Sequence, residues 1–381
     1  MEEETKTFKD LEREVVKRGI CGKCGGCVCF CSAGELNALE MGENDIPRYI
    51  NEDSCQKCGI CYLICPQTDA LDVELQKKLG WGPPIGYYQR ITSAQTTDDK
   101  IREICTDGGV VTSLLLYLLE RNLINGAIVS KKTERFARRA TVARTRQELI
   151  EAAGSMFSGS LHLEELGGRY TTYTPILSTI KSLEERYLHD IAVVGTPCQI
   201  NAIRKMQCLG IIPAHLVKYT IGLFCIENFS FDDVAREMLE KKLDINLDEI
   251  VKLNIKDDFI ITLTKDVTIH VPLEEVHEVA RPACLTCRDF SNEYADISVG
   301  GLGSPDGHTT VLIRTNVGTS VYDGALRKGY IRERIFEDAE ERRVEKTKIL
   351  AKIVSFARRK KRRSEERLSA LARGEGFGRK V

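Results

Sequence analysis

Two runs of cysteines in the first 65 residues constrain this chain more than any other feature of its sequence. Both have the spacing C-x2-C-x2-C-x3-C, the first over residues 21–31 and the second over 55–65. A segment so short and so poor in large apolar side chains needs a metal or another cross-link to fold. The start of the chain is acidic and polar, without a secretory signal, and no apolar run reaches the roughly 18 residues of a membrane span. We therefore expect a cytoplasmic protein, whose thiols bind metal rather than pair as disulfides.

The repeated spacing favours iron–sulfur clusters over zinc. It resembles the pattern of bacterial two-cluster ferredoxins, in which the fourth cysteine of each run ligates the cluster of the other run. Zinc ribbons, the alternative, usually combine C-x2-C pairs across longer loops. Residues 1–78 are therefore predicted to form a ferredoxin-like domain with two [4Fe-4S] clusters. The predicted ligand sets are Cys21, Cys24, Cys27 and Cys65 for one cluster, and Cys55, Cys58, Cys61 and Cys31 for the other.

The first run departs from the ferredoxin pattern in two ways. Cys31 is followed by Ser32, whereas Cys65 is followed by Pro66. Cys29 is surplus, so it is either a packed thiol or a competitor of Cys31 for the cluster. If one cluster is unusual, we expect it to be the one that takes its fourth thiolate from this run.

Residues 79–335 have the pattern of an α/β domain. A stretch rich in glycine and proline at 79–88 indicates a linker or domain entrance. Helical and strand patterns then alternate, which predicts a mixed sheet covered by helices, so that the whole chain is a multidomain α/β (α+β) protein. The predicted elements are helices at 109–122 and 178–188, a buried strand at 124–130, a strand, turn and helix over 190–206, and a hairpin or meander over 250–273.

Several motifs in this region resemble one known family. Four cysteines lie in distinct local settings: Cys198 in "GTPCQ", Cys225 in "GLFC", and Cys284 with Cys287 in "CLTC". Together with three glycine motifs, they resemble the β subunit family of coenzyme F420 hydrogenases and dehydrogenases over roughly residues 90–330. A ferredoxin segment in front is most like the F420H2-oxidising input subunit of F420H2 dehydrogenases. The glycine motifs are "TDGGVVTSLL" (106–115), "GGRYTTYTP" (167–175) and "DISVGGLGSPDGHTTVLIRT" (296–315).

The resemblance implies FAD in the middle domain, a third [4Fe-4S] cluster held by the four cysteines above, and coenzyme F420 as substrate. A deazaflavin gives up a hydride and a cluster accepts one electron, so a flavin must mediate between them. Hydride transfer between stacked rings needs no general acid or base, and no catalytic side chain is predicted. Cys105 and Cys208 are left as ordinary thiols. The predicted FAD contacts are Asp107, Gly108, Gly109, Thr112, Arg169, Tyr170, Thr171, Thr172, Gly303, Ser304, Gly307, His308, Thr309 and Thr310, with Ser155 and Ser158 as alternatives to the second motif.

A basic segment offers a landing site for the phosphodiester and glutamates of the deazaflavin tail. Residues 130–146 carry seven Lys and Arg against one Glu. Arginine forks suit phosphate and carboxylate groups. A solvated charged surface is the alternative. The candidate substrate contacts are Lys131, Lys132, Arg135, Arg138 and Arg139.

Residues 336–381 are predicted to be a basic helical tail. An apolar stripe at helical spacing runs from Ile349 to Ala357, and "RRKKRR" follows at 358–363. From residue 341 onward the chain carries fifteen Lys and Arg against five Asp and Glu. Such a helix can dock on a partner subunit or on the anionic inner face of a membrane. A solvated helix is the alternative, and no nucleic acid is expected.

The leading hypothesis is an enzyme that oxidises F420H2 through FAD and passes electrons by three [4Fe-4S] clusters to a partner complex. The reverse direction uses the same parts. The partner complex would be of the hydrogenase, heterodisulfide reductase or membrane F420H2 dehydrogenase type. The alternatives are an electron-transfer adapter without a substrate of its own, and a ferredoxin-linked reductase of a chlorophyll-type macrocycle.

Overall fold

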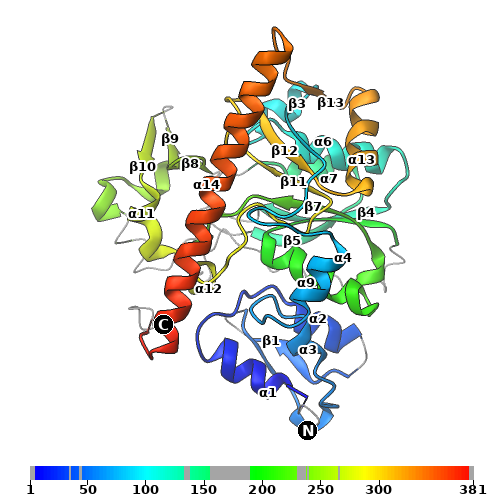
Figure 1. Ribbon diagram of the computed structural model, residues 1–381, viewed down its shortest axis with the longest axis vertical. Helices are drawn as coiled ribbons and strands as arrows, with labels where there is room; N and C mark the ends of the chain where they lie inside the picture. Colours follow the sequence, from blue (N-terminus) through cyan, green and yellow to red (C-terminus); the bar gives the residue numbers. More distant parts are fainter. Residues whose placement is uncertain are drawn as a thin grey trace.

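The centre of the molecule is an eight-stranded mixed sheet (Figure 1). The computed structural model describes residues 5–33, 36–42, 45–132, 138–154, 189–229, 237, 240–264 and 267–376. From one edge to the other the strands are β13 (Ile331–Glu333), β3 (Arg90–Thr96), β12 (Thr309–Ile313), β11 (Ile297–Gly300), β7 (Val217–Leu223), β6 (Ile191–Gly195), β4 (Gly126–Lys132) and β5 (Arg138–Ala143).

Four parallel strands, β11, β7, β6 and β4, lie together in the middle, and the strands outside them are antiparallel. The central strands are nearly continuous runs of buried residues, as expected where both faces of a sheet are covered. The predicted strand, turn and helix over 190–206 is confirmed. β6 ends at Gly195, Thr196 caps the next helix, and Pro197 occupies its first turn, where its missing N–H costs nothing.

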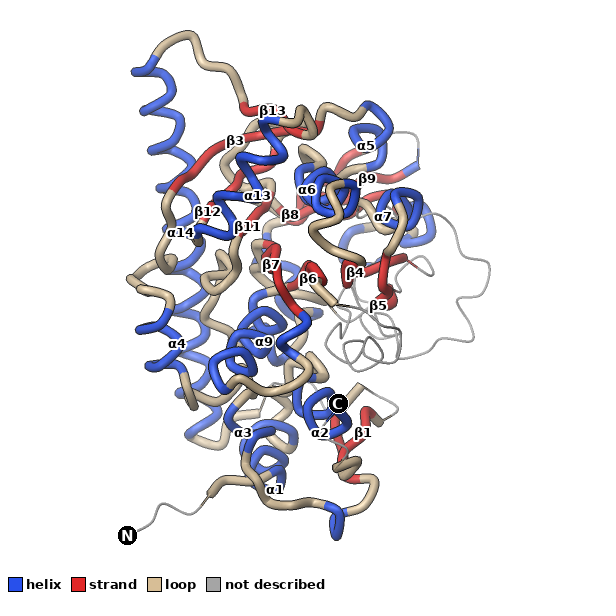
Figure 2. The backbone as a smooth tube through the Cα atoms, turned by 90° about the vertical axis from the view of Figure 1, so that its right-hand side faces the viewer, coloured by secondary structure: helices blue, strands red, loops and turns tan. Residues whose placement is uncertain are grey.

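Helices cover the sheet on both faces (Figures 1 and 2). The described helices are α1 (Phe8–Leu11), α2 (Gly26–Ala33), α3 (Ile60–Leu63), α4 (Asp72–Lys78), α5 (Asp99–Ile104), α6 (Val110–Glu120), α7 (Arg146–Glu151), α9 (Pro197–Leu209), α11 (Leu273–Val276), α12 (Pro282–Leu285), α13 (Asn316–Arg327) and α14 (Ala339–Ala372).

Alternate residues of the strands belong to different hydrophobic cores. In β12, Val311 and Ile313 pack with α6 and α13, whereas Leu312 packs with α14 and a second sheet on the opposite face. This second sheet is the predicted meander, formed by β8 (Ile250–Ile255), β9 (Phe259–Leu263) and β10 (Thr268–Val271). The mixed α/β architecture expected from the sequence is therefore confirmed.

The cysteine-rich N-terminal segment sits at one end of the molecule, beside α9. It contains α1 to α4 and a small hairpin of β1 (Leu39–Met41) and β2 (Pro47–Tyr49). Phe8, Leu11 and Val15 pack in a cluster with several of its cysteines. A fully buried lysine of α9, Lys205, pairs with Asp72 at 2.7 Å and so joins the segment to the body of the molecule.

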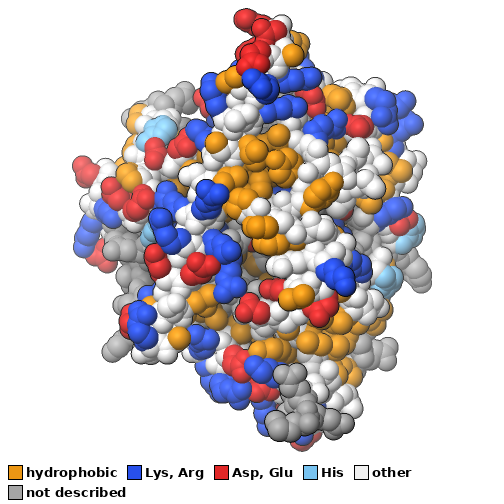
Figure 3. Space-filling model, viewed as in Figure 1, with side chains coloured by type: hydrophobic (Ala, Val, Ile, Leu, Met, Phe, Trp, Pro, Cys, Tyr) orange, Lys and Arg blue, Asp and Glu red, His pale blue; other side chains and the backbone are white. Residues whose placement is uncertain are grey.

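The C-terminal helix is packed into the body over much of its length. Figure 1 shows α14 running from the β13 end of the molecule to the N-terminal segment. Ile349, Ile353 and Ala357 belong to the core that it shares with the second sheet. On the exposed side, Lys and Arg side chains follow the helix with Asp and Glu among them (Figure 3). The predicted helix is confirmed, but within the described residues it is not set apart from the fold as a separate tail.

The remaining sequence predictions have different outcomes. The helix at 109–122 and the strand at 124–130 are confirmed by α6 and β4. The predicted helix at 178–188 lies outside the described residues. Among the described helices, none is both long and apolar enough to cross a membrane. The cytoplasmic location and the domain boundaries stay predictions.

Candidate functional site

A cavity of about 430 Å³ opens at the carboxyl ends of the four parallel strands. The ends of β4, β6, β7 and β11 contribute Ser130, Gly195, Leu223 and Gly300 to its wall, and β8 closes another side. Ligands of open α/β sheets bind at this edge, because loops and helix starts converge there. The volume lies within the usual range of small-molecule and cofactor sites.

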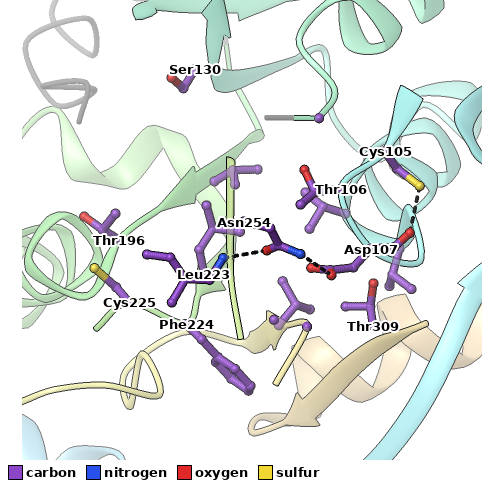
Figure 4. A pocket seen from close by; sticks show the side chains of 18 of the residues that line it. Cys105, Thr106, Asp107, Ser130, Thr196, Leu223, Phe224, Cys225, Asn254 and Thr309 are labelled. Atoms are coloured by element: carbon purple, nitrogen blue, oxygen red, sulfur yellow. Dashed lines mark hydrogen bonds between the residues drawn. The ribbon is translucent and has the colours of Figure 1, made fainter. Parts of the chain in front are cut away.

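One side of the cavity is built around Asp107, which precedes α6 (Figure 4). Its carboxylate accepts a hydrogen bond from Asn254 of β8 at 3.3 Å. Burial raises the pKa of Asp107 above its ordinary value, while nearby Lys256 and Asn254 oppose the shift. A Cβ atom on Gly301 would lie only 2.4 Å from the carboxylate, so this close approach requires glycine.

The sequence-predicted FAD contacts fall into three groups. Asp107, Gly109, Thr112 and Thr309 line the cavity, three of them from the start of α6 and one from β12. Arg169, Tyr170, Thr171 and Thr172, with the alternatives Ser155 and Ser158, lie outside the described residues. The contacts that do not line the cavity are Gly108, Gly303, Ser304, Gly307, His308 and Thr310.

The contacts that miss the cavity have other roles in the fold. Gly108 lets two chain segments touch, because a Cβ there would lie 2.6 Å from the backbone of Ala94. Ser304 donates a buried hydrogen bond to the Ser93 hydroxyl at 2.8 Å. Gly303 packs on Ile349 of α14. The third glycine motif therefore reaches the cavity through residues 299–302 and Thr309, and the positions between them face elsewhere.

The sequence did not single out several residues that line the cavity. Gly300 and Gly301 lie in the third motif, just before the glycine that was chosen from it. Phe224 lies beside Cys225, where its ring occupies the space that a Cβ on Gly300 would need. Asn254 has no motif around it, since it lies in an ordinary alternating strand. The sequence motifs therefore located the region of the cavity, but they did not identify which of its residues face the cavity.

The predicted substrate-binding cations are only partly described. Lys131 does not line the cavity and pairs with Glu151 at 2.5 Å. The structure does not describe Arg135. It also does not describe the side chains of Lys132, Arg138 and Arg139. A different cation, Lys256, which follows β8, lines the cavity and pairs with Asp306 at 2.6 Å.

The four middle cysteines come together beside the cavity. Cys198 is the second residue of α9, Cys225 follows β7, and Cys284 and Cys287 lie at α12. Burial raises the pKa of Cys225, and the thiols of Cys284, Cys287 and Cys198 are close enough to raise it further. Cys225 also lines the cavity, on the side away from Asp107 (Figure 4).

Hydrogen-bond donors surround these thiols. The backbone N–H of Asn228 donates to Sγ of Cys284 at 3.3 Å, and its side-chain amide donates to Sγ of Cys225 at 3.3 Å. The hydroxyl of Thr196 lies 3.3 Å from Sγ of Cys198. Such contacts stabilise thiolates and are one means of setting a cluster potential.

The eight predicted ferredoxin ligands gather in the two expected sets. One small cavity is lined by Cys21, Cys24, Cys27 and Cys65, and another by Cys31, Cys55, Cys58 and Cys61. Burial raises the pKa of Cys61 and of Cys65 to about 12. In the described part of the chain, no three His, Cys, Asp or Glu side chains are placed to hold a single metal ion.

The three cysteine groups follow one another through the molecule. A Cβ atom on Gly22 would lie 3.9 Å from Cβ of Cys198, which brings the first ferredoxin set against the middle group. Cys27 of the first set lies close enough to Cys61 of the second set for the Cys61 thiolate to raise its pKa. The cavity, the middle group and the two ferredoxin sets therefore form a series.

The surplus Cys29 lines neither of the two small cavities around which the ferredoxin cysteines gather, although it shares a core with Cys24. It is 1% exposed and packs in a core with Leu75, Ile128 and Ile203. The structure thus favours the packed thiol over the competing ligand. Cys105 lies at the cavity wall, where its Sγ donates to the backbone oxygen of Asp107 at 2.9 Å.

Comparison with models of protein families identifies the family of this chain. The family is described as "Coenzyme F420 hydrogenase/dehydrogenase, beta subunit" and has one model for each end of its sequence. Residues 91–167 match the N-terminal model, and residues 188–339 match the C-terminal model. Together the two matches cover more than half of the chain.

Individual relatives agree with the family match. The coenzyme F420 hydrogenase subunit beta of Methanothermobacter thermautotrophicus is 32% identical over 260 residues, which cover 67% of this chain and 88% of that protein. One of the subunits of the F(420)H(2) dehydrogenase of Methanosarcina mazei is 28% identical over 319 residues, covering 81% of this chain and 83% of that protein.

A solved structure gives the same result at the level of the fold. A chain of the F420-reducing [NiFe] hydrogenase complex from Methanosarcina barkeri, in a xenon derivative, superposes with a TM-score of 0.65 at 29% identity. The match covers 78% of this chain and 97% of that one. The chain therefore belongs to the coenzyme F420 hydrogenase/dehydrogenase beta subunit family and is an F420-dependent oxidoreductase subunit.

Proposed function

We propose that this chain oxidises F420H2, or reduces F420 in the reverse direction, and exchanges electrons with a partner complex through one FAD and three [4Fe-4S] clusters. The FAD would occupy the cavity at the carboxyl ends of the parallel strands. The partner complex would be of a type that its relatives name, a hydrogenase or an F420H2 dehydrogenase.

The position of Cys225 is the observation that carries the proposal. This residue lines the cavity and also belongs to the middle group of cysteines. A flavin in the cavity and a cluster on these thiols would therefore share one wall. Such closeness is required wherever a two-electron and a one-electron carrier exchange electrons.

The cavity fits a flavin in size and in the chemistry of its wall. FAD, when bound, accepts a hydride and releases its electrons one at a time. Gly300 and Gly301 line the cavity, and their missing Cβ atoms let Phe224 and Asp107 pack against its floor. The first turn of α6 presents Val111 and Thr112 to the cavity, where backbone amides can bind phosphate oxygens. Apolar residues from β4, β7 and β8 exclude water from the reacting rings.

The proposed ligand sets rest on the cavities that the ferredoxin cysteines line and on the mutual closeness of the four middle cysteines. We assign Cys198, Cys225, Cys284 and Cys287 to the middle cluster. The ferredoxin sets keep the exchange expected from the sequence, with Cys65 joining the first run and Cys31 joining the second. Because the three groups form a series, the N-terminal segment is the proposed exit towards the partner.

Cofactor content tests the proposal. The full chain, purified without oxygen, should contain about twelve iron atoms, since each of three clusters holds four, together with one FAD. Iron and sulfide analysis and flavin fluorescence after acid release would measure both. About eight iron atoms without flavin would contradict the proposal and favour an electron-transfer adapter.

A further inference from the structure

A fully buried lysine of the C-terminal helix reaches the middle group of cysteines. Lys360 is 1% exposed although it lies inside the basic run at 358–363. Its ammonium group donates a hydrogen bond to the backbone oxygen of Cys225 at 2.6 Å. The side chain therefore points from α14 into the body, at the wall shared by the cavity and the cysteine group.

No carboxylate within the described part of the chain forms an ion pair with Lys360. Two buried carboxylates are close enough to attract Lys360, but neither is placed to form an ion pair with it. Asp289 accepts hydrogen bonds from the backbone N–H groups of Asn292 and Glu293 at 2.8 and 2.9 Å. Glu227 pairs with Arg363 at 2.6 Å. A buried charge is costly unless an opposite charge compensates it.

A second buried lysine shows the arrangement that Lys360 lacks. Lys205 of α9 also donates to the backbone oxygen of a proposed ligand, Cys65, at 3.1 Å. Its charge, however, is matched by Asp72 at 2.7 Å. The two lysines thus occupy similar positions at two different cysteine groups, and only Lys205 has a carboxylate of its own.

We infer that Lys360 compensates the negative charge of the cluster proposed for Cys198, Cys225, Cys284 and Cys287, and thereby raises its reduction potential. The inference rests on the cluster assignment proposed above. A cluster with four thiolate ligands carries negative charge, and reduction adds one more. A fixed positive charge in a dry interior therefore stabilises the reduced form more than the oxidised form. Lys360 would therefore influence electron transfer through the charge it places beside the cluster, without touching the substrate.

The test removes the charge and keeps a polar group. Lys360→Gln replaces the ammonium group by a neutral amide on a side chain one bond shorter, so the positive charge is lost while a hydrogen-bond donor remains. A redox titration of the anaerobic full-length chain, followed by electron paramagnetic resonance, should show one cluster potential shifted downward and the other two unchanged. The matched control is Lys352→Gln on the same helix, because Lys352 is exposed and pairs with Asp257 at 2.8 Å.

Each outcome decides one question. An unshifted potential in Lys360→Gln, or an equal shift in Lys352→Gln, would overturn the inference while leaving the proposed function intact. About eight iron atoms in the unmodified chain would instead overturn the cluster assignment itself. If Lys360→Gln loses the middle cluster, retention of that cluster in Lys360→Arg supports charge compensation. Loss in both variants contradicts it.

Discussion

Cys198 occupies the first turn of α9, and the Thr196 hydroxyl lies 3.3 Å from its sulfur. Among the four cysteines of the middle group, this one also lies against the first ferredoxin set, at Gly22. Its loss should therefore interrupt the series at a single point.

Replacing Cys198 by serine should break the connection between the cavity and the ferredoxin segment. We expect about four iron atoms fewer per chain, FAD retained and still reduced by F420H2, and ferredoxin clusters that stay oxidised. Iron analysis with optical and paramagnetic resonance spectra would measure this. Cys208→Ser is the matched control, since Cys208 lies on the same helix outside all three cysteine groups. Unchanged iron content and cluster reduction in Cys198→Ser would show that this thiol is not a ligand.

The sequence predicted cysteine positions better than cavity contacts. A ligand spacing such as C-x2-C-x2-C-x3-C reflects local geometry, so three cysteines of each set could be grouped from spacing, and the resemblance to two-cluster ferredoxins implied the exchange of the fourth. Which glycine of a motif faces the cavity depends on strand register and on neighbours far away in sequence. Gly301 faces it because Asp107 approaches from another element, and no local pattern records this.

At the scale of elements, α14 behaves as part of the core. Ile353 is fully buried between the helix and the second sheet, in the same cluster as Leu312 of β12. Further along the helix, Arg363 donates a hydrogen bond to the backbone oxygen of Cys284 at 3.3 Å. The helix therefore links the central sheet to the middle cysteine group.

Truncating Ile353 to alanine should strongly destabilise the protein. We expect a loss of about 2–5 kcal/mol in the free energy of unfolding, because the change leaves a cavity in the core. Urea unfolding of the anaerobic protein, followed by circular dichroism, would give the value. Val344→Ala on the exposed part of the same helix should change it by no more than about 0.5 kcal/mol. Equal, small effects at both positions would mean that α14 is a detachable tail.

The basic composition of this helix hid its packing from sequence analysis. Lysine is almost never fully buried unless it is paired, so a run such as "RRKKRR" predicts a solvated face. Lys360 departs from that rule, and the group that explains it comes from Cys225, 135 residues away in sequence. The helix itself and its apolar stripe were predictable, whereas its partner surface was not.

At the scale of the whole molecule, the architecture was predictable but the strand order was not. Alternating helices and strands indicated a mixed sheet, yet β11 pairs with β7 and β12 pairs with β3, although the strands of each pair lie far apart in sequence. That order places Cys225, Ser130 and Gly195 around one cavity. The N-terminal segment lies beside α9, so that the cavity and the three cysteine groups form a series.

The most direct test of this account is anaerobic mixing of the full chain with F420H2, followed by flavin absorbance and the paramagnetic signals of the clusters. We predict that the flavin is reduced first and that electrons then appear on the clusters, including those of the N-terminal segment. A chain that contains FAD but is not reduced by F420H2 would contradict the account. So would reduction of the flavin while every cluster stays oxidised.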